Sequence, residues 1–195
     1  MPKALTEMTL EELWQLFPIE LVPPAPEWAG MYAEEAELLK SKLPPASWIR
    51  LEHIGSTAVK TIWAKPIVDM LLETTQDADW ESLKTTLGEL GYLVMSQSER
   101  RMSLNKGYTP QGFADRVFHL HIRRPGDHDE LFFRDYLIDH PEAAKAYEQL
   151  KLRLAGSYRY DRDGYTAAKT EMIQQITEKA KAEQAPYGQK GNYDE

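Results

Sequence analysis

Asp69 is the residue of this chain whose surroundings point most directly to chemistry. It lies within the run Pro66-Ile67-Val68-Asp69-Met70-Leu71-Leu72-Glu73, where almost every other side chain is apolar, as is typical of a strand covered on both faces. A buried carboxylate requires a hydrogen-bond partner, a cation or an open cleft, because burying it unpaired is costly. A structural ion pair with Lys65 or an arginine is the alternative that involves no ligand. Glu73 is interpreted as the solvated end of the strand.

Two histidines in a second strand-like run, residues 117–122, are the next candidates. His119 and His121 are two residues apart, so their imidazoles share one face of a strand while the intervening apolar side chains face the core. Paired imidazoles are common ligands of first-row metal ions, and neutral imidazole also serves as acid or base. Arg123 continues the same face, which favours an anionic substrate. A surface pair without function is the alternative.

A glycine-serine turn follows the strand predicted at residues 48–54. In His53-Ile54-Gly55-Ser56-Thr57, the glycine permits close approach of a ligand, and the turn offers backbone amides and a hydroxyl to a phosphate. A carboxylate from the next strand can then hold a divalent cation against that phosphate. An ordinary turn is the alternative.

The C-terminal part of the chain adds further candidates. Tyr165 and Lys169 are four residues apart on a predicted helix, so they can meet a base or phosphate together, and Arg134 and Lys151 are also available. The alternative is a helix face packed through its tyrosine and solvated at its lysine.

Periodicity and breakers predict an α+β domain that could position these residues. We expect one domain over residues 1–184, with a helical N-terminal arm (1–45), a sheet region (46–125) and a helical C-terminal part (126–184), followed by a flexible tail (185–195). Gly107, Pro110 and Gly112 are expected to lie in a loop. The five strands are predicted at residues 48–54, 66–73, 92–95, 102–104 and 117–122.

Composition excludes several classes of function. The chain has no cysteine, so disulfides, thiolate metal sites and a cysteine nucleophile are excluded. Its net charge of −8 argues against broad nucleic-acid binding. We expect a cytoplasmic protein without membrane association, because neither a signal sequence nor a span of about 20 apolar residues is present.

Four segments occur in a fixed order along the chain. They are His53-Ile54-Gly55-Ser56-Thr57-Ala58-Val59, Ala64-Lys65-Pro66-Ile67-Val68-Asp69, Phe118-His119-Leu120-His121-Ile122 and Phe133-Arg134-Asp135-Tyr136-Leu137. With these segments, the chain resembles the GrpB family over about residues 18–181. The resemblance implies a nucleotidyltransferase-like fold: a small mixed β-sheet with flanking helices and a helical C-terminal portion. It also implies a relation to a domain fused to some bacterial dephospho-coenzyme A kinases.

The resemblance also implies roles for individual residues. Gly55 and Ser56 would hold a phosphate, and Asp69 would be the first carboxylate of a metal site for Mg²⁺ or Mn²⁺. The second carboxylate would fall at Leu71, which cannot bind a cation. His119 or His121 would stand in for a third acid. This departure from the pattern places catalysis in question.

Together these observations predict a protein that binds a nucleotide or another phosphorylated metabolite with a divalent metal and transfers a nucleotidyl group to a small acceptor. A non-catalytic nucleotide or coenzyme A binding protein and a histidine- and aspartate-ligated metal hydrolase are the alternatives. The sequence does not specify the oligomeric state. The residues expected to catalyse and to hold the metal are Asp69, His119 and His121. Those expected to bind substrate or phosphate are His53, Gly55, Ser56, Thr57, Lys65, Arg123, Arg134, Tyr165 and Lys169.

Overall fold

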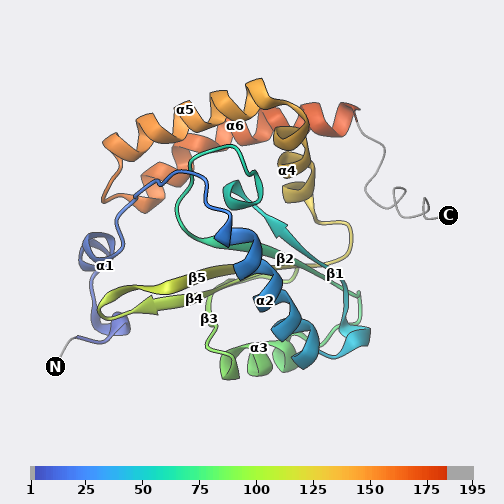
Figure 1. The fold of residues 1–195 in the computed structure, drawn as a ribbon. Coiled ribbons are helices and arrows are strands. Elements are labelled where there is room, and N and C mark those ends of the chain that lie inside the picture. Colours follow the sequence, from blue (N-terminus) through green and yellow to red (C-terminus); the bar gives the residue numbers. More distant parts are fainter. Residues whose placement is uncertain (1–2, 184–195) are drawn as a thin grey trace.

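A five-stranded mixed sheet forms the centre of the computed structural model, which describes residues 3–183 (Figure 1). The strand order is β1-β2-β5-β4-β3, with β2 and β5 parallel and the other neighbours antiparallel. The predicted α+β class is confirmed, and the predicted tail lies outside the described residues. The strands are β1 (Trp48–Ile54), β2 (Val68–Thr74), β3 (Leu93–Gln97), β4 (Arg101–Thr109) and β5 (Gly112–Arg123).

Six α-helices surround this sheet within the described range. Figure 1 shows α2 and α3 on one side of the sheet and α4, α5 and α6 together on the other. Several begin at the expected signals: Thr9 and Glu12 form a capping box on α1, and the Asp79 side chain caps α3. The helices are α1 (Leu10–Leu16), α2 (Glu27–Lys42), α3 (Trp80–Glu89), α4 (Asp129–Asp139), α5 (Pro141–Ser157) and α6 (Arg162–Glu183).

The larger hydrophobic core lies between the sheet and helices α2 and α3. Alternate residues of the central strands, such as Met70 and Leu120, point into it and meet Leu39 of α2 and Leu83 of α3. These four side chains are almost completely buried. Because side chains alternate along a strand, the intervening residues of β2 and β5 face the opposite side, toward α4, α5 and α6.

That opposite face is covered differently. The C-terminal helices pack mainly against one another and against the segment between β1 and β2, in a second apolar cluster. A small third cluster of Ile54, Leu71 and Leu131 joins the sheet to α4. The sheet face between these contacts is therefore free to line a cavity.

The β4–β5 hairpin differs from the prediction of a loop around Gly107, Pro110 and Gly112. Both strands run on to a tight turn, and Thr109 pairs with Gly112. Gly107 lies inside β4 at an irregularity in the pairing, with φ of +95°, and a Cβ there would meet the carbonyl oxygen of Arg116. The glycine therefore marks a bulge within a strand, where a glycine is required by the close approach of the neighbouring backbone.

Glu73 also differs from the interpretation of a solvated strand end. Its side chain is buried, lies 2.8 Å from Nε of Arg50 and accepts a hydrogen bond from the Gly126 amide. Because β1 and the loop after β5 both reach this end of β2, the carboxylate is enclosed and has a structural role. None of the helices in residues 3–183 has the length and apolar content needed to cross a membrane.

Candidate functional site

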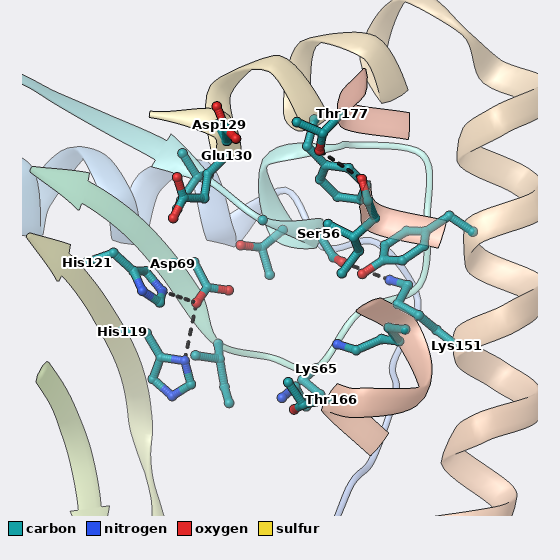
Figure 2. A pocket seen from close by; sticks show the side chains of 18 of the residues that line it. Ser56, Lys65, Asp69, His119, His121, Asp129, Glu130, Lys151, Thr166 and Thr177 are labelled. Atoms are coloured by element: carbon teal, nitrogen blue, oxygen red, sulfur yellow. Dashed lines mark hydrogen bonds and ion pairs between the residues drawn. The ribbon is translucent and has the colours of Figure 1, made fainter. Parts of the chain in front are cut away.

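The parallel register of β2 and β5 brings the three central candidates together. Asp69 is opposite His119, and His121 follows two residues later on the same face. The Asp69 Oδ1 atom lies 3.2 Å from His119 Nδ1 and 3.2 Å from His121 Nε2 (Figure 2). The Asp69 side chain is 27% exposed. It is therefore reachable from the cavity and is not sealed in an ion pair with a lysine or arginine.

The electrostatics of this trio favour a neutral imidazole beside an ionised carboxylate. Burial alone would raise the pKa of Asp69, but hydrogen bonds from His119 and His121 outweigh it and hold the pKa well below its usual range. Burial lowers the pKa of His119, although the nearby Asp69 opposes that shift. A neutral imidazole and an ionised carboxylate are the charge states that metal ligands have.

Tyr108 contacts the second nitrogen of the His119 ring, the one that does not face Asp69. Its hydroxyl lies 2.9 Å from His119 Nε2 and accepts a hydrogen bond of 3.0 Å from Arg162 Nη2. Arg162 also donates to the carbonyl oxygen of Phe17. The bulge at Gly107 shifts the pairing of β4 just before Tyr108. Sequence periodicity missed this residue, and the isolated glycine in a strand-like run was the available signal.

The glycine-serine turn lies directly against Asp69. Gly55 has φ of +71°, and a Cβ at this position would be 2.8 Å from Asp69 Oδ2. A short 3-10 helix, Ser56–Ala58, follows; its first bonded amides are those of Ala58 and Val59. The predicted approach of this turn to Asp69 is therefore present in the structure.

A cavity of about 560 Å³ lies between this sheet face and the C-terminal helices. Figure 2 shows Asp129 and Glu130 on the side nearer His121, and Lys65 and Lys151 on the other side. Of the predicted site residues, those that line the cavity are Gly55, Ser56, Thr57, Lys65, Asp69, His119, His121, Tyr165 and Lys169.

Five lysine and arginine side chains line this cavity: Arg101, which is paired with Asp127, and the group Lys65, Lys151, Arg162 and Lys169. Burial lowers the pKa of Lys65 and of Lys151 to about 7, and that of Lys169 to about 8, with the positive charge of neighbours as a further cause. The protein thus holds several cations together at a free-energy cost that an anion in the cavity would remove.

Lys151 is the most enclosed of these cations. It is 2% exposed, and its Nζ donates to the Ser56 hydroxyl over 2.9 Å and to the Trp63 carbonyl. Helix α5 thereby connects directly with the glycine-serine turn. Arg162 belongs to the same cluster but was not among the sequence candidates, because nothing in its local pattern distinguishes it from a solvated residue in the first turn of a helix.

Tyr165 presents a buried polar group to the cavity. It is 1% exposed, and its hydroxyl has no hydrogen-bond partner among residues 3–183. Lys169 Nζ lies 4.3 Å from its ring centroid, and Lys65 Nζ lies 5.6 Å from it. A buried hydroxyl without a partner is costly, so a polar ligand group beside this ring would be stabilised.

Three predicted residues lie outside the cavity lining and support its wall. His53 stacks on Tyr32 and lies 2.9 Å from the Thr57 hydroxyl, and burial lowers its pKa to about 4. Arg134 donates to the His53 carbonyl oxygen. Arg123 is buried and donates to Glu130. These contacts shape the glycine-serine turn and the position of α4.

Fold and site together define an α+β protein with a cation-lined cavity beside a candidate metal centre of one aspartate and two histidines. A family model described as GrpB protein matches residues 18–179, which is most of the chain. The chain therefore belongs to the GrpB family, as the sequence motifs predicted.

Individual relatives agree with this assignment. A UPF0157 protein of Pseudomonas aeruginosa is 37% identical over 84% of this chain and 68% of its own length. The UPF0157 protein YqkA of Bacillus subtilis is 32% identical over 88% of this chain, and the match spans about half (51%) of its length. The glutamate-rich protein GrpB of Alkalihalophilus pseudofirmus is 31% identical over 80% of this chain and 92% of its length.

A solved structure gives the same family. The crystal structure of the conserved protein GrpB from Enterococcus faecalis matches with a TM-score of 0.71 and 31% identity, over 83% of this chain and 96% of that chain. The MgGTP-bound Cid1 poly(U) polymerase is more distant, with a TM-score of 0.47 and 14% identity over 76% of this chain and 46% of that chain. A likeness this weak identifies neither an activity nor a ligand.

Proposed function

We propose that this protein binds a nucleotide or another phosphorylated metabolite in the cavity, with its phosphates among Lys65, Lys151, Lys169 and Arg162. The observation that carries the proposal is the convergence of these four basic side chains, from three separate parts of the chain, on one cavity of a protein whose net charge is −8. Basic groups gathered in a hollow favour a polyanion, because each phosphate charge interacts with more than one of them.

The depressed lysine pKa values support the same ligand class. Near neutral pH, Lys65 and Lys151 are only partly protonated, since burial and neighbouring cations lower each pKa to about 7. A bound phosphate would raise both values and restore full charge. The unpartnered hydroxyl of Tyr165 would gain a hydrogen bond from the same ligand. A ligand without negative charge would leave the repulsion in place.

A divalent cation fits beside the phosphate position. The donor atoms of Asp69, His119 and His121 lie within 4.8 Å of one another, and the carboxylate and a neutral imidazole are in the states that bind metal. A bound ion would supply positive charge to a phosphate oxygen. Gly55 keeps the turn close to the same carboxylate, so metal and phosphate positions would adjoin.

Transfer of a nucleotidyl group to a small acceptor is the reaction that this arrangement would serve if it turns over. Leu71 favours the alternative, a binding protein without catalysis, because this side chain is fully buried between Ile54 and Leu131. A relative named dephospho-CoA kinase, from Mycolicibacterium paratuberculosis, is 28% identical over 78% of this chain and 43% of its own length. Dephospho-coenzyme A therefore belongs in a ligand panel.

Thermal unfolding with added ligands tests the proposal. Protein freed of metal by chelation is heated with ATP, AMP, dephospho-coenzyme A, coenzyme A or inorganic phosphate, each with and without Mn²⁺. We expect at least one phosphorylated compound to raise Tm, and Lys151→Met and Lys169→Met to reduce that rise. Lys40→Gln is the matched control, because Lys40 is an exposed lysine of α2 paired with Glu37. Equal responses of all four proteins, or no response to any compound, would contradict the proposal.

Long incubation of the stabilising nucleotide with the protein separates the two forms of the proposal. Release of pyrophosphate that stops in Asp69→Asn indicates transfer or hydrolysis. Stabilisation without any product indicates a binding protein.

A further inference from the structure

The chemistry of the donor set in β2 and β5 decides which cation it can hold. Magnesium requires oxygen ligands in near-octahedral geometry and commonly retains several waters. The trio instead offers two imidazole nitrogens, from His119 and His121, and one carboxylate oxygen, from Asp69. Imidazole is a favourable ligand for Mn²⁺, Co²⁺ and Zn²⁺, which bind nitrogen and oxygen together. The donor set does not fit the Mg²⁺ named among the sequence expectations.

Among the residues that the structure describes, the trio is the only group of three potential metal ligands. The next residue on the same face of β2 is Leu71, which is fully buried in the apolar cluster with Ile54 and Leu131. On the α4 wall of the cavity, Glu130 accepts from Arg123 through Oε1 while its Oε2 has no partner among the described residues, and Asp129 pairs with Lys181. Neither acid belongs to the group of ligand atoms that lie within 4.8 Å of one another at the trio. The trio therefore suits one ion.

A second layer of contacts prepares His119 as a ligand. Arg162 can only donate, so the Tyr108 oxygen accepts its hydrogen bond and still has both a proton and a lone pair for His119 Nε2. If Nδ1 of His119 binds a metal through its lone pair, Nε2 carries the proton and donates a hydrogen bond to the Tyr108 oxygen. A metal-binding histidine commonly has such an oxygen partner on its other nitrogen, which fixes the ring and its tautomer.

We infer that Asp69, His119 and His121 form a site for a single first-row transition ion, of the Mn²⁺, Co²⁺ and Zn²⁺ class, that selects against Mg²⁺, and that Tyr108 is its positioning residue. The inference deepens the metal part of the proposed function and rests on that part alone. Three protein ligands leave coordination positions open toward the cavity, where a phosphate oxygen or water can bind.

Cobalt provides a direct test because its visible absorption reports the ligands around it. The chelator-treated protein is titrated with Co²⁺, and Zn²⁺, Mn²⁺ and Mg²⁺ are then added in competition. We expect saturation at one ion per chain, displacement by Zn²⁺, and retention of the spectrum in a hundredfold excess of Mg²⁺. Saturation at two ions, displacement by Mg²⁺ at that excess, or no visible band at all would overturn the inference. These wild-type measurements do not depend on whether a variant folds.

Variants locate the site and test the role of Tyr108. Tyr108→Phe keeps the ring but removes the oxygen, and we expect a loss of about 10–100-fold in Co²⁺ affinity with an altered spectrum. His121→Asp replaces a nitrogen donor by oxygen, and we expect Mg²⁺ to compete measurably better than in wild type. His140→Asn, at the start of α5 and outside the cavity, is the control and should bind as wild type does. Unchanged binding in His121→Asp, with folding verified by circular dichroism, would place the ion elsewhere.

The outcome is separable from that of the proposed function. Metal binding is measured without a phosphorylated ligand. The response to nucleotides is measured on chelator-treated protein, by comparing wild type with the Lys151 and Lys169 variants. Selective Co²⁺ binding without any nucleotide response would sustain the metal site and reject the proposed function. Stabilisation by a nucleotide, together with displacement of Co²⁺ by Mg²⁺, would support the proposed function and reject the inferred metal site.

Discussion

Asp69 Oδ2 occupies the space into which a side chain at Gly55 would project, 2.8 Å from the position of a Cβ there. Gly55 directly follows β1, and Ile54 at the end of β1 pairs with Asp69 in the adjacent antiparallel strand β2. The absence of a side chain at position 55 therefore sets how close the turn can come to the carboxylate. It also gives the first prediction.

Gly55→Ala should destabilise the protein and weaken ligand binding together. The new methyl group would contact Asp69 and would require a left-handed backbone at φ of +71°, so we expect a loss of about 1–3 kcal/mol in the free energy of unfolding. Urea denaturation measures it. Gly30→Ala, inside α2 with no atom near its Cβ position, is the control and should gain up to about 1 kcal/mol. A stable Gly55→Ala with unchanged Co²⁺ binding would contradict this close packing.

Stability should rise with pH above neutrality. Burial lowers the pKa of Lys151 to about 7 from its ordinary 10.5. Between these values the unfolded chain binds more protons than the folded chain, so the free energy of unfolding increases from pH 7 toward pH 10. Lys151→Met removes this group from the titration, and the slope should become smaller. Urea unfolding of both proteins at pH 7, 8 and 9 measures the difference, and parallel curves would refute it.

Binding of a nucleotide should take up protons at pH 8. At this pH, Lys65 and Lys151 are mostly neutral and Lys169, with a pKa of about 8, is about half protonated; a phosphate among them raises each pKa. Calorimetric titration with ATP in two buffers of different ionisation enthalpy measures the uptake. We expect a net gain of protons that decreases in Lys169→Met. Proton release, or identical heats in both buffers, would show that the lysines do not meet the phosphates.

Leu71→Asp should destabilise the protein without creating a second ion site. The new carboxylate would replace a fully buried side chain in the cluster with Ile54 and Leu131, at a cost of about 3 kcal/mol or more. Burial would raise the pKa of the new acid, so the loss should be smaller at pH 5 than at pH 7. Leu71→Asn, which has no charge, should lack this pH dependence. Full stability with a second bound Co²⁺ would show that position 71 faces the metal.

The sequence predicted the elements where periodicity and local signals agree. The first strand is found at Trp48–Ile54 as predicted, and Asp79 and Pro141 lie at the starts of their helices. Spacing alone placed His119 and His121 on one face, and the buried run around Asp69 indicated a second strand beside them. The family motifs added the glycine-serine turn. These are properties of short segments, so one sequence suffices to find them.

Features that depend on distant contacts were not predictable in the same way. The position of Glu73 predicts a solvated strand end, but the loop after β5 encloses it. Tyr108 reaches His119 only because Gly107 bulges the hairpin, and Arg162 joins the cavity only because α6 packs beside α5. His53, Arg123 and Arg134, which the sequence predicts to bind a ligand, lie outside the cavity lining and contact its wall. Such assignments require the packing of helices on the sheet.

The parallel pairing of β2 with β5 joins segments about fifty residues apart in the chain, so Asp69 and the two histidines meet only when β5 has paired with β2. Long-range pairing of this kind forms late, because the loop must close before its contacts contribute. Nascent chains that stop short of β5 lack the complete trio. The visible absorption of bound cobalt would then report on refolding, because it would appear only once β5 has paired with β2.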